Sequence, residues 1–289
     1  MKILLTGSTG FIGRRLLAGL VASGHQVYPV VRGAYENLAS AEVISWDMEK
    51  QSIPYGLPKR IDAVAHLALP QDFRRFPESV NGLYAVNVTA TMALLEYAMK
   101  ADASRFFLAT TGNSIAPDPG LEVGETPTPP NDFYTASKLA GEMLVRPFRS
   151  CFPVHVGRMF FPYGAGQQGR VIWRLIEQIK LGKPVKLEQG LDGNGSVLSL
   201  TNVDDMAGAI QSSIENSWNG VFDLAAPERL SIRDIALEIG RQTRKTVTFE
   251  TGTEPAKKMV ADLSMLKKYY KMDQFRLFSK GLADMLSLS

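Results

Sequence analysis

The chain has 289 residues, 45% of them apolar, and its formal net charge at neutral pH is only +3. That length and apolar content suit one large domain or two interleaved ones with a substantial core. The charge is too small to indicate a nucleic-acid partner. The single cysteine, Cys151, excludes an intrachain disulfide and fits a reducing compartment, and we expect it to pack in the core.

Neither end of the chain nor its middle indicates a membrane or a metal. The apolar run at residues 3–5 is too short for a signal peptide, and no later stretch is long enough to span a bilayer. The histidines, His25, His66 and His155, are scattered and show no zinc-ligand spacing. We therefore expect a soluble cytoplasmic protein with no membrane partner and no metal site.

Short apolar strands alternate with helical patterns along the chain. Residues 2–6, 10–22 and 26–31 predict a strand, a helix and a second strand, which together form a βαβ unit. Further strands are predicted at 63–67, 105–109 and 154–158, with helices at 83–100 and 134–146. This alternation predicts an α/β fold, a Rossmann-type doubly wound parallel sheet.

A glycine-rich turn follows the first predicted strand, in the run Gly7-Ser8-Thr9-Gly10-Phe11-Ile12-Gly13. Gly7 permits the tight turn, Gly10 lets the backbone approach a pyrophosphate, and Gly13 allows the helix to pack closely on the sheet. Unpaired N–H groups at the start of the helix, around Phe11 and Ile12, favour an anion. A lone glycine pattern is weak, but strand, turn and helix in this order predict dinucleotide binding.

Tyr134 and Lys138 lie four residues apart in a predicted helix, so their side chains share one face. A nearby ammonium favours the phenolate, and we therefore expect a lowered pKa for Tyr134 and a role in acid–base catalysis. Tyr55 and Lys59 have the same spacing, but Gly56 and Pro58 break a helix there. This second pair has the motif spacing without the helix, and we call it the decoy pair.

The end of the second predicted strand indicates which cofactor is bound. A site that prefers NAD usually has an acid about 20 residues beyond the glycines, whereas this chain has Arg32 there. The guanidinium fork suits an adenosine 2'-phosphate, so the sequence favours NADP, with NAD as the alternative. Pro29 is unusual in this strand, because proline removes a ladder donor from what should be an interior position.

These motifs resemble the extended short-chain dehydrogenases/reductases of the NAD-dependent epimerase/dehydratase family, over nearly the whole chain. Further matching stretches are Asp47-Met48, Ala65-His66-Leu67-Ala68, Asn87-Val88-Thr89-Ala90-Thr91, residues 158–164 and Val203-Asp204-Asp205. The resemblance implies that Asp47 and Met48 border the adenine. It also implies that Leu67 and Ala68 border the phosphates and the nicotinamide ribose, and that Asn87 and Phe160 lie near the cofactor.

The resemblance implies a third catalytic residue, a serine or threonine after the strand at 105–109, which Thr111 matches. Its hydroxyl would hold the substrate oxygen while Tyr134 exchanges the proton and Lys138 binds the nicotinamide ribose. Thr110 is the alternative for that position. Either threonine could instead simply satisfy backbone groups at the end of a strand.

Departures from the family pattern narrow the reaction. Dehydratases of the family carry Asp-Glu after the catalytic threonine, where this chain has Gly112-Asn113, so dehydration is disfavoured. Relatives that act on nucleotide sugars commonly have an Asn in place of Phe161 and an Arg-Asp pair in place of Leu198-Ser199. A nucleotide-sugar substrate therefore stays open.

The favoured hypothesis is an NADP-dependent oxidoreductase acting at a carbinol or ketone carbon of a sugar-like or other small polar molecule. Two alternatives are a nucleotide-sugar epimerase that retains its NAD(P) and a non-catalytic NADP-binding sensor. We expect a Rossmann domain from residues 1–164 and about 197–224, with a smaller interleaved substrate-binding domain from about 165–196 and 225–289. The resemblance suggests a homodimer through the helices beginning near Leu83 and Tyr134, since Met92, Leu95 and Met99 give the first helix a second apolar side.

Overall fold

The computed structural model describes residues 1–33, 42–50, 52–115 and 132–287, and its centre is a seven-stranded sheet in the order β11-β6-β5-β4-β1-β2-β3. Every pairing in this sheet is parallel. The strands are β1 (Lys2–Thr6), β2 (Gln26–Val31), β3 (Ile44–Ser45), β4 (Ala63–His66), β5 (Arg105–Thr111), β6 (Val154–Met159) and β11 (Gly220–Leu224). The chain winds outward in both directions from β1, so the predicted doubly wound sheet is confirmed.

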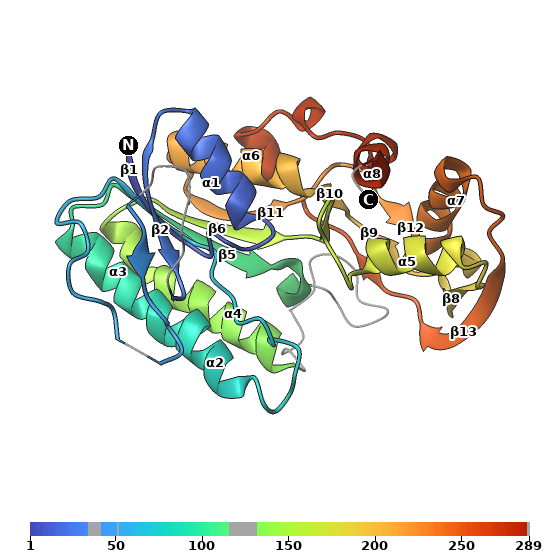
Figure 1. The fold of residues 1–289 in the computed structure, drawn as a ribbon, viewed down its shortest axis with the longest axis horizontal. Helices are drawn as coiled ribbons and strands as arrows, with labels where there is room; N and C mark the ends of the chain where they lie inside the picture. The colour runs from blue at the N-terminus through green and yellow to red at the C-terminus, as the bar shows by residue number, and fades with distance from the viewer. Residues whose placement is uncertain (34–41, 51, 116–131, 288–289) are drawn as a thin grey trace.

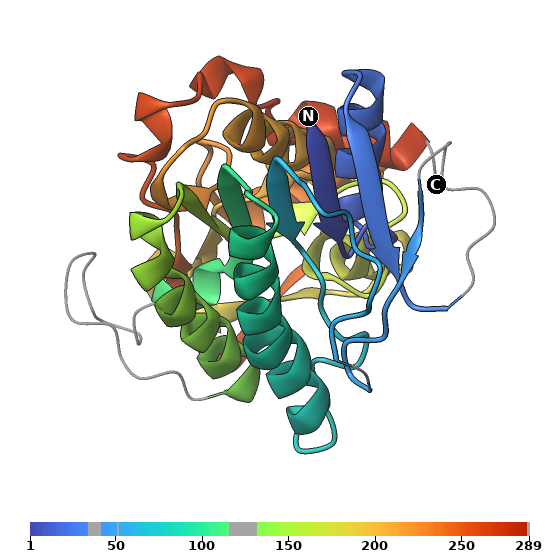
Figure 2. The same cartoon turned by 90° about the vertical axis from the view of Figure 1, so that its left-hand side faces the viewer.

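Helices cover both faces of this sheet (Figures 1 and 2). One face carries α1 (Gly13–Ala22) and α6 (Val203–Glu215), which bury a core cluster that includes Leu16 and Ile210. The other carries α3 (Thr91–Lys100) and α4 (Phe133–Val145), over a cluster that includes Leu94 and Val145. The near-continuous apolar strands follow from this double coverage. Within the described ranges, no helix is both long and apolar enough to cross a bilayer.

The helix predicted at residues 83–100 is instead three consecutive segments. Helix α2 (Val80–Tyr84) leads into a π-helical segment, η1 (Ala85–Ala90), and then into α3. The hydroxyl of Thr91 donates to the carbonyl of Asn87 over 2.8 Å, so this carbonyl has a side-chain donor within the widened turn. Such π-helical turns often occur at functional sites, and this one carries Asn87.

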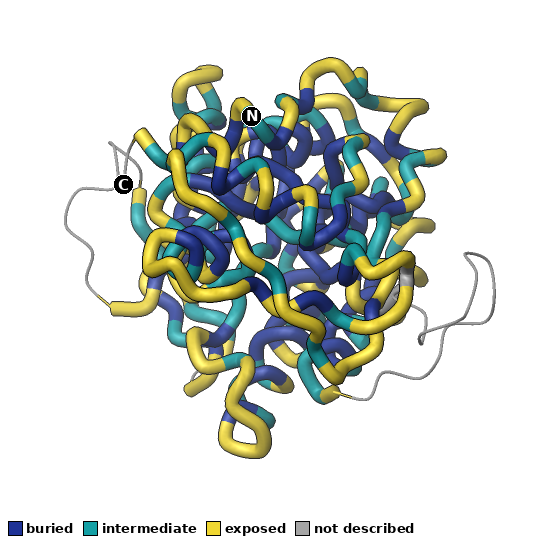
Figure 3. The backbone as a smooth tube through the Cα atoms, turned by 90° about the vertical axis from the view of Figure 1, so that its right-hand side faces the viewer, coloured by how far each residue is buried: buried dark blue, intermediate teal, exposed yellow. Residues whose placement is uncertain are grey.

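A second core cluster lies beyond the sheet, at the right of Figure 1. Its helices are α5 (Val171–Lys180), α7 (Ile232–Thr243) and α8 (Phe278–Ser287). Its strands are β8 (Val185–Gln189) paired with β13 (Phe249–Pro255), and β9 (Val197–Leu198) paired with β12 (Leu230–Ser231) and β14 (Lys258–Met259). Figure 3 shows this side with a buried interior and an exposed rim.

The remaining elements are short connections. Strands β7 (Pro162–Tyr163) and β10 (Thr201–Asn202) pair between the sheet and the second cluster. The short 3-10 turns are η2 (Gly112–Ile115), η3 (Pro147–Ser150), η4 (Leu191–Gly193), η5 (Leu266–Lys268) and η6 (Met272–Gln274).

The environment of Cys151 differs from the sequence expectation. Cys151 is exposed, so its predicted core position is wrong; it follows the turn η3, and Phe152 takes the buried position beside it.

Pro29 pairs with Leu5 of β1, but on the other side β3 reaches only Val30 and Val31. Strand β2 is thus an edge at Pro29 on that side, where a proline is tolerated.

The glycine turn brings backbone atoms too close together for larger side chains. A Cβ atom on Gly13 would lie 2.0 Å from the carbonyl oxygen of Gly7. Gly7 itself has φ +69, and a Cβ there would lie 2.6 Å from the carbonyl carbon of Leu67. The turn therefore joins the first strand, the first helix and the loop after β4 by direct backbone contact.

We predict that Gly13→Ala lowers the free energy of unfolding by about 1–3 kcal/mol or more, because the backbone must separate to admit one methyl group. Gly208→Ala is the matched control, since a Cβ there meets only the Tyr270 hydroxyl at 3.6 Å. Alanine inside helix α6 should leave stability unchanged or raise it by up to about 1 kcal/mol. Chemical denaturation of both variants measures this, and equal stabilities would contradict the close-contact account.

Candidate active site

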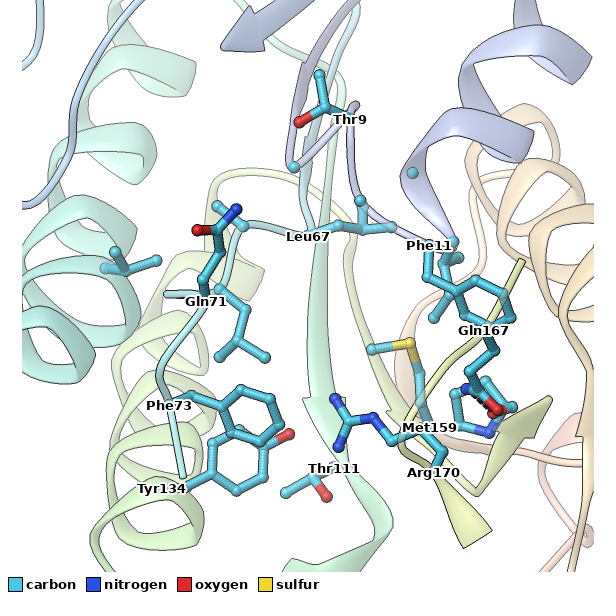
Figure 4. Close-up of a pocket in the computed structure, with 18 of the residues that line it drawn as sticks. Thr9, Phe11, Leu67, Gln71, Phe73, Thr111, Tyr134, Met159, Gln167 and Arg170 are labelled. Carbon is cyan, nitrogen blue, oxygen red and sulfur yellow. Dashed lines mark hydrogen bonds between the residues drawn. The ribbon is translucent and has the colours of Figure 1, made fainter. Parts of the chain in front are cut away.

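A cavity of about 660 Å³ opens at the carboxyl ends of β1, β2, β4 and β5 (Figure 4). It lies where the strand order reverses, which is the usual ligand position in doubly wound sheets. Most of the predicted site residues line it: Gly7, Gly10, Phe11, Ile12, Gly13, Arg32, Met48, Leu67, Ala68, Thr111, Tyr134 and Phe160. Asp47, Asn87 and Lys138 are not among the lining residues.

The glycine turn forms a cradle for an anion at one end of this cavity. The N–H of Gly10 donates to the carbonyl of Gly7 over 3.0 Å, which closes the turn. Among the described residues, no acceptor pairs with the backbone N–H of Phe11 or Ile12, directly before helix α1. Unpaired N–H groups at a helix start, beside glycines that leave no side chain in the way, fit the pyrophosphate of a dinucleotide.

A buried network fixes the loop that faces the glycine turn. The Nε2 atom of His66 lies 3.1 Å from the carbonyl of Val86, which can only accept, so Nε2 carries the proton. Nδ1 therefore accepts from the Thr6 hydroxyl over 2.7 Å. The same hydroxyl oxygen accepts the N–H groups of Leu67 and Ala68, each over 3.2 Å. Burial lowers the pKa of His66 from 6.5 to about 3, so the ring stays neutral.

Asn87 lies behind the cavity and contacts the helix that carries Tyr134. Its Nδ2 atom donates to the Ser137 hydroxyl over 2.9 Å, and that hydroxyl donates to the carbonyl of Tyr134 over 2.9 Å. The Oδ1 atom of Asn87 is buried with no hydrogen-bond partner among the described residues. Asn87 therefore orients helix α4 from the protein side.

Helix α4 presents Tyr134 to the cavity from its first turn. Asp132 caps the helix by accepting the N–H of Thr135 over 2.8 Å. The phenol points into the cavity close to Thr111, and the ring centre lies 4.8 Å from that of Phe73 (Figure 4). The hydroxyl groups of Tyr134 and Thr111, which are far apart in sequence, thus lie in the same part of the cavity.

The pKa of Tyr134 is raised, so the expected lowering is wrong. Burial is the largest effect, because a phenolate is poorly solvated away from water. The nearby Thr111 hydroxyl and the charges of Arg170 and Arg74 oppose it without overcoming it. Tyr134 is therefore a protonated phenol at neutral pH, which suits it to donate a proton.

Lys138 is buried beneath the site and donates to the carbonyl of Ala109 over 3.1 Å. Burial lowers its pKa from 10.5 to about 8, and the charge of Glu142 opposes that change. The Thr110 hydroxyl donates to Glu142 over 2.7 Å, and Arg158 pairs with the same carboxylate at 2.8 Å. Thr110 is thus engaged away from Tyr134, which favours Thr111 as the threonine of the site.

Arg32 lies directly after β2, at the end of the cavity away from Tyr134. Its guanidinium forms an ion pair with the carboxylate of Glu49 at 3.1 Å, and the side chain is 47% exposed. Both residues line the cavity. Any group that binds Arg32 there must also meet the charge of Glu49.

Several cavity residues were absent from the sequence prediction. Phe73, Arg74, Arg170 and Arg174 line the end near Tyr134, and Glu142 lies beneath Lys138. Glu142 follows Lys138 by four residues on the same helix, a spacing that could have found it. Phe73 and Arg74 come from a connecting segment without a periodic signal, whereas Arg170 and Arg174 lie at the start of helix α5, which the sequence analysis did not predict. Tyr55 of the decoy pair is fully exposed and lies outside any described helix.

Comparison with known proteins identifies the family. The sequence pattern of the NAD dependent epimerase/dehydratase family matches residues 3–224. The chain belongs to this family. The predicted membership is thus confirmed.

Relatives of this family member include sugar-nucleotide enzymes. UDP-glucuronic acid decarboxylase 1 of Arabidopsis thaliana is 23% identical, over 99% of this chain and 69% of that protein. UDP-glucose 4-epimerase of Mycolicibacterium smegmatis is 29% identical, over 53% of this chain and 52% of its own length. The chain thus spans about half the length of the second relative.

Solved structures show the same fold. UDP-glucuronic acid 4-epimerase from Bacillus cereus, in complex with UDP-glucuronic acid and NAD, aligns with a TM-score of 0.81 and 24% identity. That alignment covers 100% of this chain and 98% of the other. UDP-glucose 4-epimerase of Thermus thermophilus, in complex with NAD, aligns with a TM-score of 0.76 and 20% identity, over 100% of this chain and 98% of the other.

The buried amine of Lys138 should make stability depend on pH. Its pKa is about 8 in the folded chain and ordinarily 10.5, so between these values the unfolded chain binds more protons. The free energy of unfolding therefore rises with pH across this window, by about 1.4 kcal/mol for each unit of pKa difference, and the penalty is fully present below it.

We predict that the difference in unfolding free energy between wild type and Lys138→Met rises from pH 8 to 10.5. Denaturant titrations across this range measure it. The exposed lysine of the decoy pair provides the control, because Lys59→Met should give a flat difference. A flat curve for Lys138→Met would show that its amine is solvated.

Proposed function

We propose that the chain is an NADP-dependent oxidoreductase that transfers hydride at a carbinol or ketone carbon of a sugar-like or other small polar substrate. The observation that carries this proposal is that Thr111 and Tyr134 line the same cavity as the glycine turn. The family match supports the cofactor class. The neutral phenol supports a role as proton donor to a carbonyl oxygen.

The residues have separate tasks in this proposal. A bound nicotinamide supplies hydride chemistry at the substrate carbon. Thr111 holds the substrate oxygen by a hydrogen bond, and Tyr134 donates a proton to it in reduction or accepts one in oxidation. Lys138 keeps its place through Ala109 and binds the nicotinamide ribose. Phe11 and Ile12 hold the pyrophosphate through their backbone N–H groups.

The second candidate is a nucleotide-sugar epimerase with tightly held NAD(P), favoured by the names of the relatives. It uses the same tyrosine and threonine but returns the hydride to the same carbon. Stoichiometric appearance of oxidised cofactor with a ketone substrate indicates the reductase. Interconversion of sugars without net cofactor change indicates the epimerase, while bound cofactor without turnover on any carbonyl indicates a non-catalytic sensor.

We also propose that the second core cluster, built around α5, α7 and α8, is a substrate-binding domain interleaved with the Rossmann domain. Its support is that α5 contributes Val171 and Arg174 to the cavity wall opposite the sheet.

We further propose a cytoplasmic location, because the only cysteine is free and exposed, which suits a reducing compartment.

Tyr134→Phe should lower kcat by about 100-fold or more and leave cofactor affinity nearly unchanged, because it deletes the proton-transferring atom and little packing. Thr111→Val should have a smaller effect, since it removes a positioning hydrogen bond. Steady-state kinetics with NADPH, on a substrate found by screening keto-sugars and simpler ketones, measures both.

The matched control for these kinetics is Tyr55→Phe, which alters the exposed tyrosine of the decoy pair and should leave kcat unchanged. Near-normal turnover of Tyr134→Phe on a confirmed substrate would overturn the assignment of Tyr134 as the acid–base residue.

For the cofactor, we expect NADPH to bind more tightly than NADH by about 1–3 kcal/mol, through a charge-assisted contact of Arg32 with the 2'-phosphate. Arg32→Ala should remove the preference. Glu49→Gln should increase it, because the carboxylate that now pairs with Arg32 repels a phosphate. Titrations of both cofactors test this; tighter NADH binding that Glu49→Gln weakens would instead assign Glu49 to the ribose hydroxyls of NAD.

We propose a homodimer through α2, α3 and α4, whose outer side exposes Tyr84, Met99 and Met143 by 55%, 43% and 64%. Leu95, expected on that side, is fully buried within the chain. Light scattering at micromolar concentration should give a dimer, and Met143→Glu should give a monomer. Leu181→Glu, at an exposed position after α5, should stay dimeric. A monomeric wild type would contradict the proposal.

A further inference from the structure

Three arginines line the end of the cavity that holds Tyr134: Arg74, Arg170 and Arg174. Arg170 precedes the first residue of helix α5, and Arg174 follows one turn later on that helix. Arg74 comes from the segment between β4 and α2. Figure 4 shows the guanidinium of Arg170 pointing toward the phenol of Tyr134 and the hydroxyl of Thr111.

Phe73 holds two of these side chains beside the phenol. The guanidinium carbons of Arg170 and Arg74 lie 5.0 and 5.3 Å from the centre of its ring. The same ring packs at 4.8 Å from the ring of Tyr134. Cation–π contacts of this kind fix the direction of an arginine without neutralising its charge.

Nothing among the described residues neutralises this arginine group. None of the three arginines forms an ion pair there, and the one carboxylate that lines the cavity, Glu49, is paired with Arg32. Burial lowers the pKa of Arg170, and the charges of Arg74 and Arg174 lower it further. Like charges held together in a half-buried pocket are destabilising unless a ligand supplies negative charge.

The anchors of many nucleotide-sugar relatives do not account for this positive charge. Leu198 and Ser199, where those relatives commonly have an Arg-Asp pair, are buried away from the cavity. The Ser199 hydroxyl accepts the N–H of Ala261 over 3.1 Å and so serves the backbone. The cationic character of this cavity therefore comes from the segment before α2 and the start of α5.

We propose that Arg74, Arg170 and Arg174 bind an oxyanion of the substrate, a phosphate or a carboxylate, close to the carbon on which Tyr134 acts. This proposal rests on the proposed oxidoreductase or epimerase function, because it identifies the substrate of that same site as acidic. Guanidinium forks bind both oxyanions in a bidentate manner, and their convergence suits one anion shared between them. Neutral ketones would leave the arginines uncompensated and so bind poorly.

Calorimetric titration of the full chain, with and without saturating NADPH, tests this with three probes: UDP, D-glucuronate and D-glucose. At least one anionic probe should bind, and glucose should not. The dissociation constant of the bound anion should rise about 10- to 100-fold in Arg170→Gln and in Arg174→Gln, from the loss of a charge-assisted contact. NADPH affinity should stay within a factor of about three, since the cofactor cradle lies at the other end.

Arg75→Gln is the matched control. Arg75 is adjacent to Arg74 in sequence, pairs with Asp72 at 4.0 Å and does not line the cavity, so the anion should bind this variant as it binds wild type. Loss of UDP binding alone in the arginine variants assigns the site to a phosphate. Loss of glucuronate binding alone assigns it to a carboxylate adjoining the reacting carbon.

The proposal is overturned if neither anion binds wild type, or if both bind Arg170→Gln and Arg174→Gln as tightly as wild type. An equal loss of anion and NADPH affinity in the variants also overturns it, because the arginines would then serve the fold or the cofactor. Failure of the proposed function looks different: NADPH would not bind, while the anion titration without cofactor would still depend on Arg170.

Discussion

The hydrogen bond from Thr6 to His66 joins the ends of the two central strands, and the site is built outward from it. One hydroxyl donates to the imidazole and accepts the N–H groups of Leu67 and Ala68. The imidazole donates to the carbonyl of Val86. The next residue, Asn87, donates to the Ser137 hydroxyl in the helix that carries Tyr134. Because burial holds the pKa of His66 near 3, this network keeps one protonation state at physiological pH.

Charge is distributed along the cavity in a way that suits a dinucleotide and an acidic substrate. The glycine turn offers backbone N–H groups at one end, and the pair of Arg32 and Glu49 lies at the position that we propose for the adenosine ribose. The opposite end combines a neutral phenol with arginines that have no carboxylate partner in the described chain. Lys138 stays mostly protonated at neutral pH, although burial lowers its pKa to about 8.

Strand periodicity and motif spacing are local signals, and they predicted the sheet, the glycine turn and Tyr134, whereas Thr111 was implied by the family resemblance. The sequence predicted the wrong direction for the pKa of Tyr134. Spacing along a helix places Lys138 near the phenol, but only the packed structure shows how strongly burial acts on both groups. Arg170 and Arg74 were missed for a related reason, since the tertiary fold alone brings these connecting segments to one pocket.

The central claim is that one cavity brings a nicotinamide and a substrate carbon together at Tyr134. A crystal structure of the chain with NADPH tests it most directly. The account predicts the pyrophosphate at the N–H groups of Phe11 and Ile12, with the nicotinamide beside Tyr134 and its ribose at Lys138. A cofactor bound elsewhere, or one whose nicotinamide points away from Tyr134, would contradict the account.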